Sequence, residues 1–351
     1  MLVRCPFAII LQDKTNIPRI KHIAPEIEHS NLLRRYKAAV DSRLRAVSGA
    51  REPKAVYEPF RYALLSGGKR LRAVIVLLAC EAAGGKWKSA LDAAAAIEML
   101  HNFTLVHDDI MDDSVLRRGK PTVHAKWDVT TAVLSGDEMI ARAYGVLLRT
   151  STSRSNEIAR VFTNAFVEVC EGQGFDIEFE RRPGVTVDDY LMMIGKKTAF
   201  LFSAAAEIGA LIGNATARRT SALRSYGAHL GIAFQLQDDL LDVDGTREEF
   251  GKTIGGDIEQ GKKTFLLLSA LERLKGAELK EMKTILHRNG TPKISVERAR
   301  EIYSRAGIFD SARKEILRNT HHARKALASL PATPARAALG WLADRLADRN
   351  S

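Results

Sequence analysis

The sequence is organised around residues 93–113, which read AAAAIEMLHNFTLVHDDIMDD. Strong helix formers lead into a run of carboxylates, and no Gly or Pro interrupts them. We therefore predict that the acidic residues lie on an α-helix. Asp108 and Asp112 are four residues apart, and Asp109 is three residues from Asp112. At these spacings the three side chains share one side of the helix.

The pattern Asp-Asp-x-x-Asp indicates a site for Mg²⁺ and a diphosphate. Like charges at this spacing destabilise a helix unless a cation lies among them, and Mg²⁺ is usually held by one or two carboxylates together with substrate phosphates. The alternative is a solvated acidic helix face, because one copy arises by chance in about one chain in twenty of this length. A second copy, formed by Asp238, Asp239 and Asp242, follows another apolar helical run. Two copies favour the metal site.

Composition sets the class of protein. The chain has 351 residues, of which 46% are hydrophobic and 27% charged, as in ordinary globular proteins with a large core. No window of eighteen or more apolar residues occurs, so we expect no membrane span. Residues 1–25 are expected to form a loosely ordered extension, because their apolar run is too short for a signal peptide. Residues 26–351 are expected to form one domain.

The net charge and the cysteine content restrict the kinds of binding partner and of cysteine site that we expect. The net charge of +11 suits nucleic acid, an anionic membrane surface or phosphorylated substrates. Lys and Arg are spread along the whole chain, which argues against nucleic acid. The three cysteines form no Cys-x-x-Cys pair, so we expect neither disulfides nor a zinc site, and a reducing cytoplasm fits.

The remaining pattern is helical throughout, and we find no strand alternation of useful length. We therefore predict an all-α fold, built as one large bundle. Thr186 begins a region that is typical of a helix N-cap. Residues 243–264 are hydrophilic and glycine-rich, which is the composition of a loop that closes over phosphates. Helical periodicity is found in residues 27–47, 53–65, 130–148, 157–180, 204–212, 220–237 and most of 265–351.

Three groups of basic residues are candidate phosphate ligands. Gly67 and Gly68 open a helix, where free backbone N–H groups and the helix dipole favour an anion, and Lys69 and Arg72 add charge there. The alternative is an ordinary helix start with solvated basic side chains. The Arg117–Arg118 pair either balances the acidic cluster or binds phosphate oxygens. A single lysine, Lys197, is either a phosphate ligand or solvated.

On these residues the chain resembles the trans-isoprenyl diphosphate synthases, also called polyprenyl synthetases. The similarity runs from about Tyr57 to Lys263 and rests on six ordered motifs. They are Gly-Gly-Lys-Arg-Leu-Arg, His-x-x-x-Leu-Val-His-Asp-Asp-x-x-Asp with Arg-Arg-Gly, Gly-Gln-x-x-Asp, Lys-Thr, Phe-Gln-x-x-Asp-Asp-x-x-Asp and Gly-Lys. The motifs are most similar to those of the archaeal-type geranylgeranyl synthases. The resemblance implies an isoprenoid-synthase bundle with a central substrate cavity, and a homodimer.

The resemblance also implies residue roles. Asp108 and Asp112 match the ligands of two Mg²⁺ ions and Asp238 that of a third, while Asp109 and Asp242 complete the motifs. Residues that match isopentenyl diphosphate ligands are Lys69, Arg72, His101 and Arg118. Residues that match groups around the allylic diphosphate are Arg117, Lys197, Thr198, Gln235, Lys252 and Lys262.

The activity that the resemblance implies is electrophilic prenyl transfer. Mg²⁺ and the basic residues stabilise charge on the departing diphosphate, and the double bond of isopentenyl diphosphate attacks the allylic cation. No side-chain nucleophile is needed. Two rivals remain, a terpene cyclase and a catalytically silent synthase subunit. The second acidic motif and the Gly-Gly-Lys-Arg turn argue against the cyclase, and two intact acidic motifs argue against the silent subunit.

Product length depends on the floor beneath Asp108. By resemblance the floor is Phe103, five residues earlier, whereas by helical geometry Thr104, four residues earlier, lies more directly underneath. The first acidic motif lacks the two-residue insertion of typical bacterial farnesyl synthases and has an aromatic residue at Phe103, so it resembles that of the archaeal-type geranylgeranyl synthases. This resemblance implies a C20 product, with C15 second and longer chains third.

Overall fold

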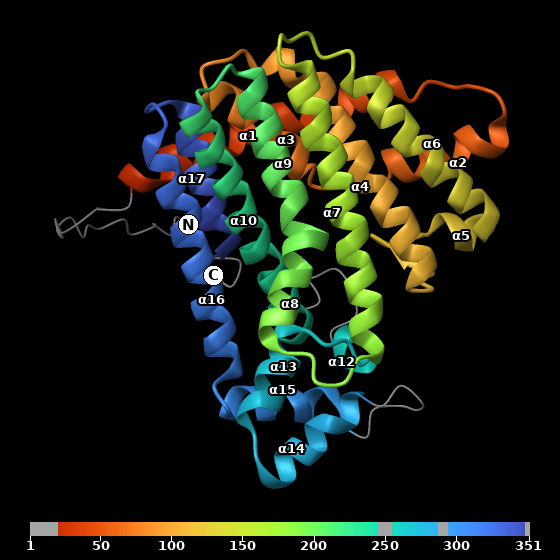
Figure 1. Ribbon diagram of the computed structural model, residues 1–351, viewed down its shortest axis with the longest axis vertical. Helices are drawn as coiled ribbons and strands as arrows, with labels where there is room; N and C mark the ends of the chain where they lie inside the picture. The colour runs from red at the N-terminus through yellow and green to blue at the C-terminus, as the bar shows by residue number, and fades with distance from the viewer. Residues whose placement is uncertain (1–19, 245–254, 287–293, 348–351) are drawn as a thin grey trace, which may run out of the picture.

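The structure is a computed structural model that describes residues 20–244, 255–286 and 294–347. Its long helices α4, α7, α9 and α10 run along the long axis of the molecule, and α13, α14 and α15 gather at one end (Figure 1). The helices are α1 (Ile20–Val47), α2 (Lys54–Leu65), α3 (Leu71–Ala82), η1 (Trp87–Ala90), α4 (Leu91–Met111), α5 (Val123–Lys126), α6 (Val129–Leu147), α7 (Ser155–Arg181), α8 (Val187–Ile194), η2 (Gly195–Ala199), α9 (Phe200–Ile212), α10 (Ala217–Asp244), α12 (Gly256–Glu259), α13 (Phe265–Arg273), α14 (Gly276–Lys283), η3 (Thr284–Leu286), α15 (Val296–Arg305), α16 (Ile308–Ala326), η4 (Leu327–Ser329) and α17 (Pro334–Ala347). The predicted all-α bundle is confirmed.

The centre of the bundle is formed by α3 and α9, which pack against each other. Residues 73–80 of α3 and 201–206 of α9 are all buried. A helix that is apolar all round must be enclosed by other helices, and α4, α7 and α10 pack against α9. These three helices supply most of the side chains of the candidate site.

One turn of the bundle is a π-helix, η2, inserted between α8 and α9. A Cβ on Gly172 of α7 would lie 2.2 Å from the backbone N of Lys197, and a Cβ on Gly231 of α10 would lie 2.4 Å from the Cα of Ala199. Glycine at both positions therefore lets α7 and α10 close on η2 from two sides. Single π turns occur often at functional sites, and this one carries Lys197 and Thr198.

The Arg117–Arg118 pair lies on a small antiparallel ribbon, β1 (Leu116–Arg117) and β2 (Lys120–Pro121). Its two-residue turn has positive φ at both Arg118 (54°) and Gly119 (72°), as a type I′ hairpin requires. The helix α4 ends at Met111, and the chain then passes into this hairpin. The arginines are therefore placed beside the acidic end of α4.

Several sequence predictions concern local features. Thr186 is the N-cap of α8, and its side chain and Asp189 form a capping box, as predicted.

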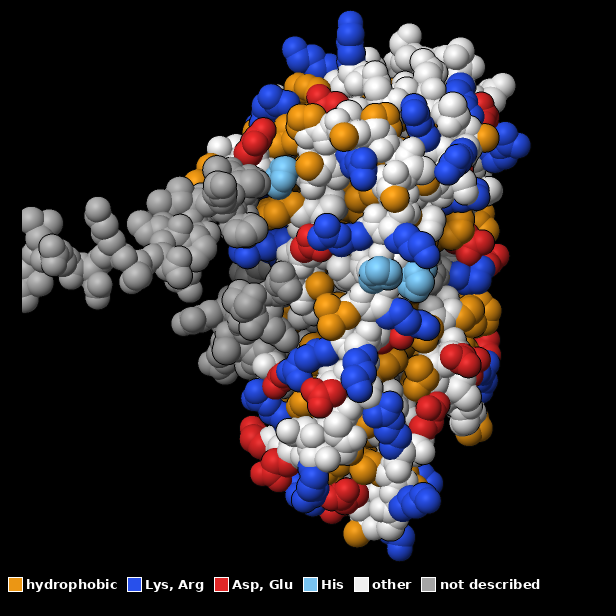
Figure 2. Space-filling model, turned by 90° about the vertical axis from the view of Figure 1, so that its left-hand side faces the viewer, with side chains coloured by type: hydrophobic (Ala, Val, Ile, Leu, Met, Phe, Trp, Pro, Cys, Tyr) orange, Lys and Arg blue, Asp and Glu red, His pale blue; other side chains and the backbone are white. Residues whose placement is uncertain are grey.

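Lys252 and residues 245–254 of the glycine-rich loop lie outside the described residues. The extension of residues 1–25 falls mostly outside them as well, so this domain boundary stays a prediction. In the described ranges, no helix is long and apolar enough to cross a membrane. Figure 2 shows Lys and Arg scattered among acidic residues on one face of the molecule.

Candidate active site

A cavity of about 300 Å³ lies between α4, α7, η2, α9 and α10, with the Arg117–Arg118 hairpin at its rim. It brings together side chains from these helices, the hairpin and the first turn of α3. Its lining residues are Arg72, His101, Thr104, Leu105, Asp108, Arg117, Arg118, Val169, Gln173, Lys197, Thr198, Leu201, Phe234, Gln235 and Asp238. Ten of these were predicted from sequence as site residues, whereas Lys69, Asp109, Asp112, Asp242, Lys262 and Phe103 are not among them.

The first acidic motif is divided between the cavity and its wall. Asp108 lines the cavity, and burial raises the pKa of its carboxyl. Asp109 is buried and accepts a 2.7 Å hydrogen bond from Nε of Arg117. Successive helix residues point about 100° apart, which is why Asp109 meets the hairpin instead of the cavity. Asp112 is the C-cap of α4, and its carboxylate lies 3.9 Å from Nζ of Lys262.

The second acidic motif is divided in the same way. Asp238 lines the cavity, whereas Asp239 and Asp242 are buried. The Asp239 carboxyl accepts hydrogen bonds from the Tyr190 hydroxyl and, at 3.0 Å, from Nε2 of Gln235. Burial, followed by the charge of Asp257, raises the pKa of Asp239 to about 8. Asp242 accepts a 3.0 Å hydrogen bond from the backbone N–H of Asp257, which holds the start of α12.

The π turn supplies a cation beside the first motif. Nζ of Lys197 lies 2.6 Å from the Asp176 carboxylate. Burial lowers the pKa of this ammonium, but Asp176 and Asp108 outweigh burial, so its pKa is raised. The neighbouring Thr198 hydroxyl donates a 2.9 Å hydrogen bond to Gln235, which joins η2 to the second motif on α10. Lys197 therefore stays charged inside a group of carboxylates.

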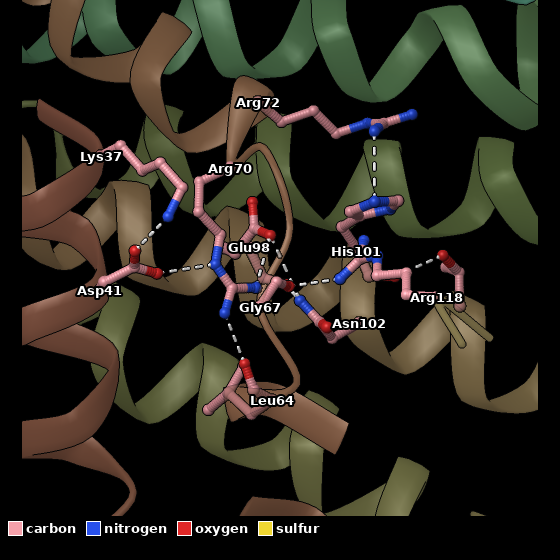
Figure 3. Close-up of polar contacts among 11 residues, drawn as sticks. Lys37, Asp41, Leu64, Gly67, Arg70, Arg72, Glu98, His101, Asn102 and Arg118 are labelled. Carbon is pink, nitrogen blue, oxygen red and sulfur yellow. Dashed lines mark hydrogen bonds and ion pairs between the residues drawn. The ribbon is translucent and has the colours of Figure 1, made fainter. Parts of the chain in front are cut away.

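A second basic group, Arg72, His101 and Arg118, also lines the cavity, and Figure 3 shows these three side chains. The Arg72 guanidinium stacks 4.2 Å from the ring centroid of Phe202, and its Nη1 lies 3.3 Å from Nε2 of His101. Burial lowers the pKa of Arg72 to about 10, so it remains protonated at neutral pH. Burial and the nearby arginines hold the pKa of His101 well below its usual range, so His101 is neutral. Arg118 belongs to the same group and donates a hydrogen bond to the backbone oxygen of Gly67.

This basic group contains a buried donor that has no partner. Nε of Arg72 is buried and makes no hydrogen bond within the described part of the chain. A buried charged donor without a partner is costly, so it indicates that the cavity accepts an anionic ligand. Lys69 precedes Arg70 on the same loop and is exposed.

The two candidate chain-length residues have different surroundings. Thr104 lines the cavity, and its hydroxyl donates a 2.8 Å hydrogen bond to the backbone oxygen of His101. Phe103 is buried and packs edge-on against Phe166, with ring centroids 5.3 Å apart. The cavity wall near Asp108 is completed by the apolar side chains of Leu105, Val169 and Leu201. Which residue sets product length stays a prediction.

The carboxylates suit Mg²⁺ that is shared with a ligand. Across the described ranges, no three His, Cys, Asp or Glu side chains are grouped as a ready-made metal site. Asp108 and Asp238 nonetheless offer hard oxygen ligands to one cavity. Mg²⁺ characteristically takes one or two carboxylates together with substrate phosphates, so these residues fit it.

Sequence reasoning assigned no role to several residues of the site. Asp176 and Gln173 belong to the quoted Gly-Gln-x-x-Asp motif, and their spacing of three residues on a helix was a usable signal. Tyr190 and Phe202 carried no such signal. They act through partners that are distant in the sequence, Asp239 and Arg72.

Known proteins resemble this chain over most of its length. A family model described as polyprenyl synthetase matches residues 53–303. The short chain isoprenyl diphosphate synthase of Methanothermobacter thermautotrophicus is 38% identical, with 92% of this chain and 99% of the relative covered. The geranylgeranyl pyrophosphate synthase of Geoglobus acetivorans is 37% identical with the same coverage. The crystal structure of geranylgeranyl pyrophosphate synthetase from Pyrococcus horikoshii is similar with a TM-score of 0.85 and 36% identity, covering 92% of this chain and 98% of that one.

Proposed function

Because the chain belongs to the polyprenyl synthetase family, as its motifs predicted, we propose that it condenses isopentenyl diphosphate with an allylic diphosphate to geranylgeranyl diphosphate (C20). One observation carries this proposal. A single cavity is lined by the carboxylates of Asp108 and Asp238 with Lys197, by Arg72 and His101, and by apolar side chains. This combination of charged and apolar side chains suits two diphosphates and an apolar tail.

The allylic diphosphate is bound on the wall formed by α4, η2 and α10. Arg117 and Lys197 pair with its oxygens, together with Thr198, Gln235, Lys252 and Lys262 as the resemblance implies. Asp108, Asp112 and Asp238 would hold three Mg²⁺ ions, which would stabilise negative charge on the departing diphosphate. The raised pKa of Lys197 supports this role, because the ammonium stays protonated beside a leaving group that carries several negative charges.

Isopentenyl diphosphate is bound by Arg72, His101, Arg118 and Lys69. The unpartnered Nε of Arg72 supports this role, since a diphosphate oxygen would satisfy it. The neutral His101 does not add a positive charge to a crowded basic group, and it can still hydrogen bond.

The reaction breaks the allylic C–O bond and forms a C–C bond. The diphosphate leaves with the bonding electrons, the double bond of isopentenyl diphosphate attacks the allylic carbon, and a proton is lost to the released diphosphate. The protein must exclude water from the cation, and Val169, Leu201 and Phe234 provide the apolar lining that does so. No side-chain nucleophile takes part.

The C20 product is supported by relatives named as geranylgeranyl synthases, including that of Methanosarcina mazei, which is 42% identical. Farnesyl (C15) and longer products remain alternatives, because a relative from Natronomonas pharaonis is a geranylfarnesyl diphosphate synthase, 37% identical. A homodimer is supported by exposed apolar side chains on one helix, Val129, Val133 and Leu134 of α6. A cytoplasmic location is supported by Cys80 and Cys170, which are free thiols.

A product analysis tests the proposal. The purified protein is incubated with Mg²⁺, isopentenyl diphosphate and, separately, the C5, C10 and C15 allylic diphosphates, and products are measured by mass spectrometry. We expect a C20 product that disappears when Mg²⁺ is chelated. Asp108→Asn should abolish it, whereas Asp113→Asn is the matched control, because the Asp113 side chain is 99% exposed.

The same experiment separates the rivals. Release of diphosphate with a cyclic hydrocarbon and no elongation would support the terpene cyclase. No reaction with any primer would support a silent subunit and refute the proposal.

A further inference from the structure

Arg70 lies between two predicted diphosphate ligands, Lys69 and Arg72, yet it is turned away from the cavity. Its side chain is 1% exposed, and Figure 3 shows it extending in a different direction from that of Arg72. No motif-based role was assigned to it. A fully buried arginine next to two ligand-binding residues calls for a separate explanation, because burying a guanidinium is unfavourable unless its donors are satisfied.

Its donors are satisfied by three different helices. Nε donates to Asp41 of α1 at 2.9 Å, Nη1 donates to Glu98 of α4 at 3.0 Å, and Nη2 donates to the backbone oxygen of Leu64 in α2 at 2.7 Å. Asp41 is in turn paired with Lys37 on α1. The planar guanidinium thus connects three helices to the residue that begins α3.

The backbone conformation of Arg70 indicates what these hydrogen bonds stabilise. Arg70 is the N-cap of α3 and has φ of 54°, in the left-handed region that side chains other than Gly rarely adopt. Gly67 and Gly68 just before it also have positive φ. The conformation at Arg70 sets the direction of the first turn of α3, and Arg72 lies in that turn. The three hydrogen bonds of the side chain hold this conformation.

Glu98 connects the same network to the cavity. Its side chain is 2% exposed and lies three residues before His101 on α4. Burial lowers the pKa of both Arg72 and Arg118, and the charge of Glu98 opposes that effect more than any other group does. Asn102 donates a 3.4 Å hydrogen bond to the Glu98 carboxylate. Glu98 is therefore the buried counter-charge of three arginines.

We propose that Arg70, anchored by Asp41 and Glu98, is a positioning residue that holds Lys69 and Arg72 in place for the diphosphate of isopentenyl diphosphate. The inference rests on the proposed function, because Arg70 would organise the isopentenyl diphosphate subsite of that function. A positioning role differs from a purely structural role in its effect on substrate binding, which can be measured. Loss of Arg70 must weaken the binding of isopentenyl diphosphate and leave that of the allylic substrate unchanged, because Arg70 contacts α1, α2 and the Glu98 turn of α4, whereas the allylic ligands lie on η2, α10 and the last turn of α4, at Asp108.

The chain offers a matched control. Arg43 of α1 pairs with Asp92 of α4, so it bridges the same two helices as the Asp41 and Glu98 contacts, and neither partner of this pair belongs to the loop before α3. Arg43→Met should lower the melting temperature and leave both substrate KM values unchanged. Any effect that Arg70 variants have beyond this control reports positioning.

The test measures KM for each substrate, kcat and the melting temperature. Arg70→Met leaves two acids without their partner, so the double variant Arg70→Met/Asp41→Asn removes the one that does not act on Arg72 or Arg118 and keeps a folded protein available. We expect KM for isopentenyl diphosphate to rise about tenfold or more, which corresponds to weakening one charge-assisted hydrogen bond, with KM for the allylic substrate within about twofold. Arg70→Lys should give a smaller rise, because one ammonium cannot reach all three acceptors.

Binding of isopentenyl diphosphate, measured by calorimetry, separates this inference from the proposed function. If the unaltered protein elongates a primer and the folded double variant keeps its KM for isopentenyl diphosphate, the positioning role is refuted and the function stands. If the unaltered protein neither elongates nor binds isopentenyl diphosphate, both are refuted.

Discussion

The closest helix contact in the site leads to a prediction for Gly172. A Cβ at this position would lie 2.2 Å from the backbone N and 2.6 Å from the Cα of Lys197. These are backbone atoms, which cannot rotate aside as the end of a side chain can. In Gly172→Ala, either α7 or η2 must therefore move by about an ångström to restore an ordinary contact. Overpacking of this kind costs about 1–3 kcal/mol of the free energy of unfolding.

The displacement should also lower the rate of the reaction. The atoms in the way belong to the π turn that carries Lys197 and Thr198, and Lys197 lies 2.6 Å from Asp176. A misplacement of about 1 Å in a catalytic arrangement can reduce the rate by about a hundredfold. We expect Gly172→Ala to lower the elongation rate by about one to two orders of magnitude at saturating isopentenyl diphosphate.

Urea unfolding followed by circular dichroism and initial elongation rates check this prediction. Gly174→Ala is the matched control, because Gly174 lies on the same helix and a Cβ there would meet nothing within 4 Å. That variant should gain about 0.5–1 kcal/mol, since alanine is the better helix former. The reasoning is refuted if Gly172→Ala is as stable and as active as Gly174→Ala.

Two further predictions concern α4. Thr104→Phe should shorten the product towards C15 by filling the cavity, and Phe103→Ala should lengthen it, both read by mass spectrometry; unchanged products would remove these residues as the floor. The unfolded chain binds a proton at His101 near pH 6.5 and the native protein does not, so acidification below that pH should lower the free energy of unfolding by about 1.4 kcal/mol per pH unit through this group. His101→Gln should flatten this dependence in urea titrations between pH 7 and 5, and an unchanged slope would contradict the burial of a neutral His101.

Local patterns predicted the helices and the carboxylates that meet in the cavity. Helix formers before Asp108 and the capping signal at Thr186 act within one or two turns, so they can be recognised from sequence alone. The π turn at Gly195–Ala199 could not be predicted in this way. It depends on the approach of α7 and α10, and the residues that allow it, Gly172 and Gly231, lie more than twenty positions away.

In each acidic motif, the two adjacent carboxylates point in different directions. Asp108 and Asp238 line the cavity, whereas their immediate neighbours, Asp109 and Asp239, are buried and hydrogen bonded to groups outside the motif. A helix turns by about 100° per residue, so two adjacent carboxylates cannot serve one ligand equally. In each pair, one acid is available to bind and the other fixes the helix against a neighbouring element, Arg117 of the hairpin or Tyr190 of α8.

The basic motif shows the same difference between neighbours, because the buried side chain of Arg70 lies between two candidate ligands, Lys69 and Arg72. Sequence spacing identifies which residues belong together, but it does not say which of them face the ligand. That distinction depends on partners from other helices, such as Asp41 and Glu98 for Arg70. Substituting a residue that faces the ligand should change substrate affinity or rate directly. Substituting its buried neighbour should act through the position of the first, so a conservative replacement should restore much of the loss.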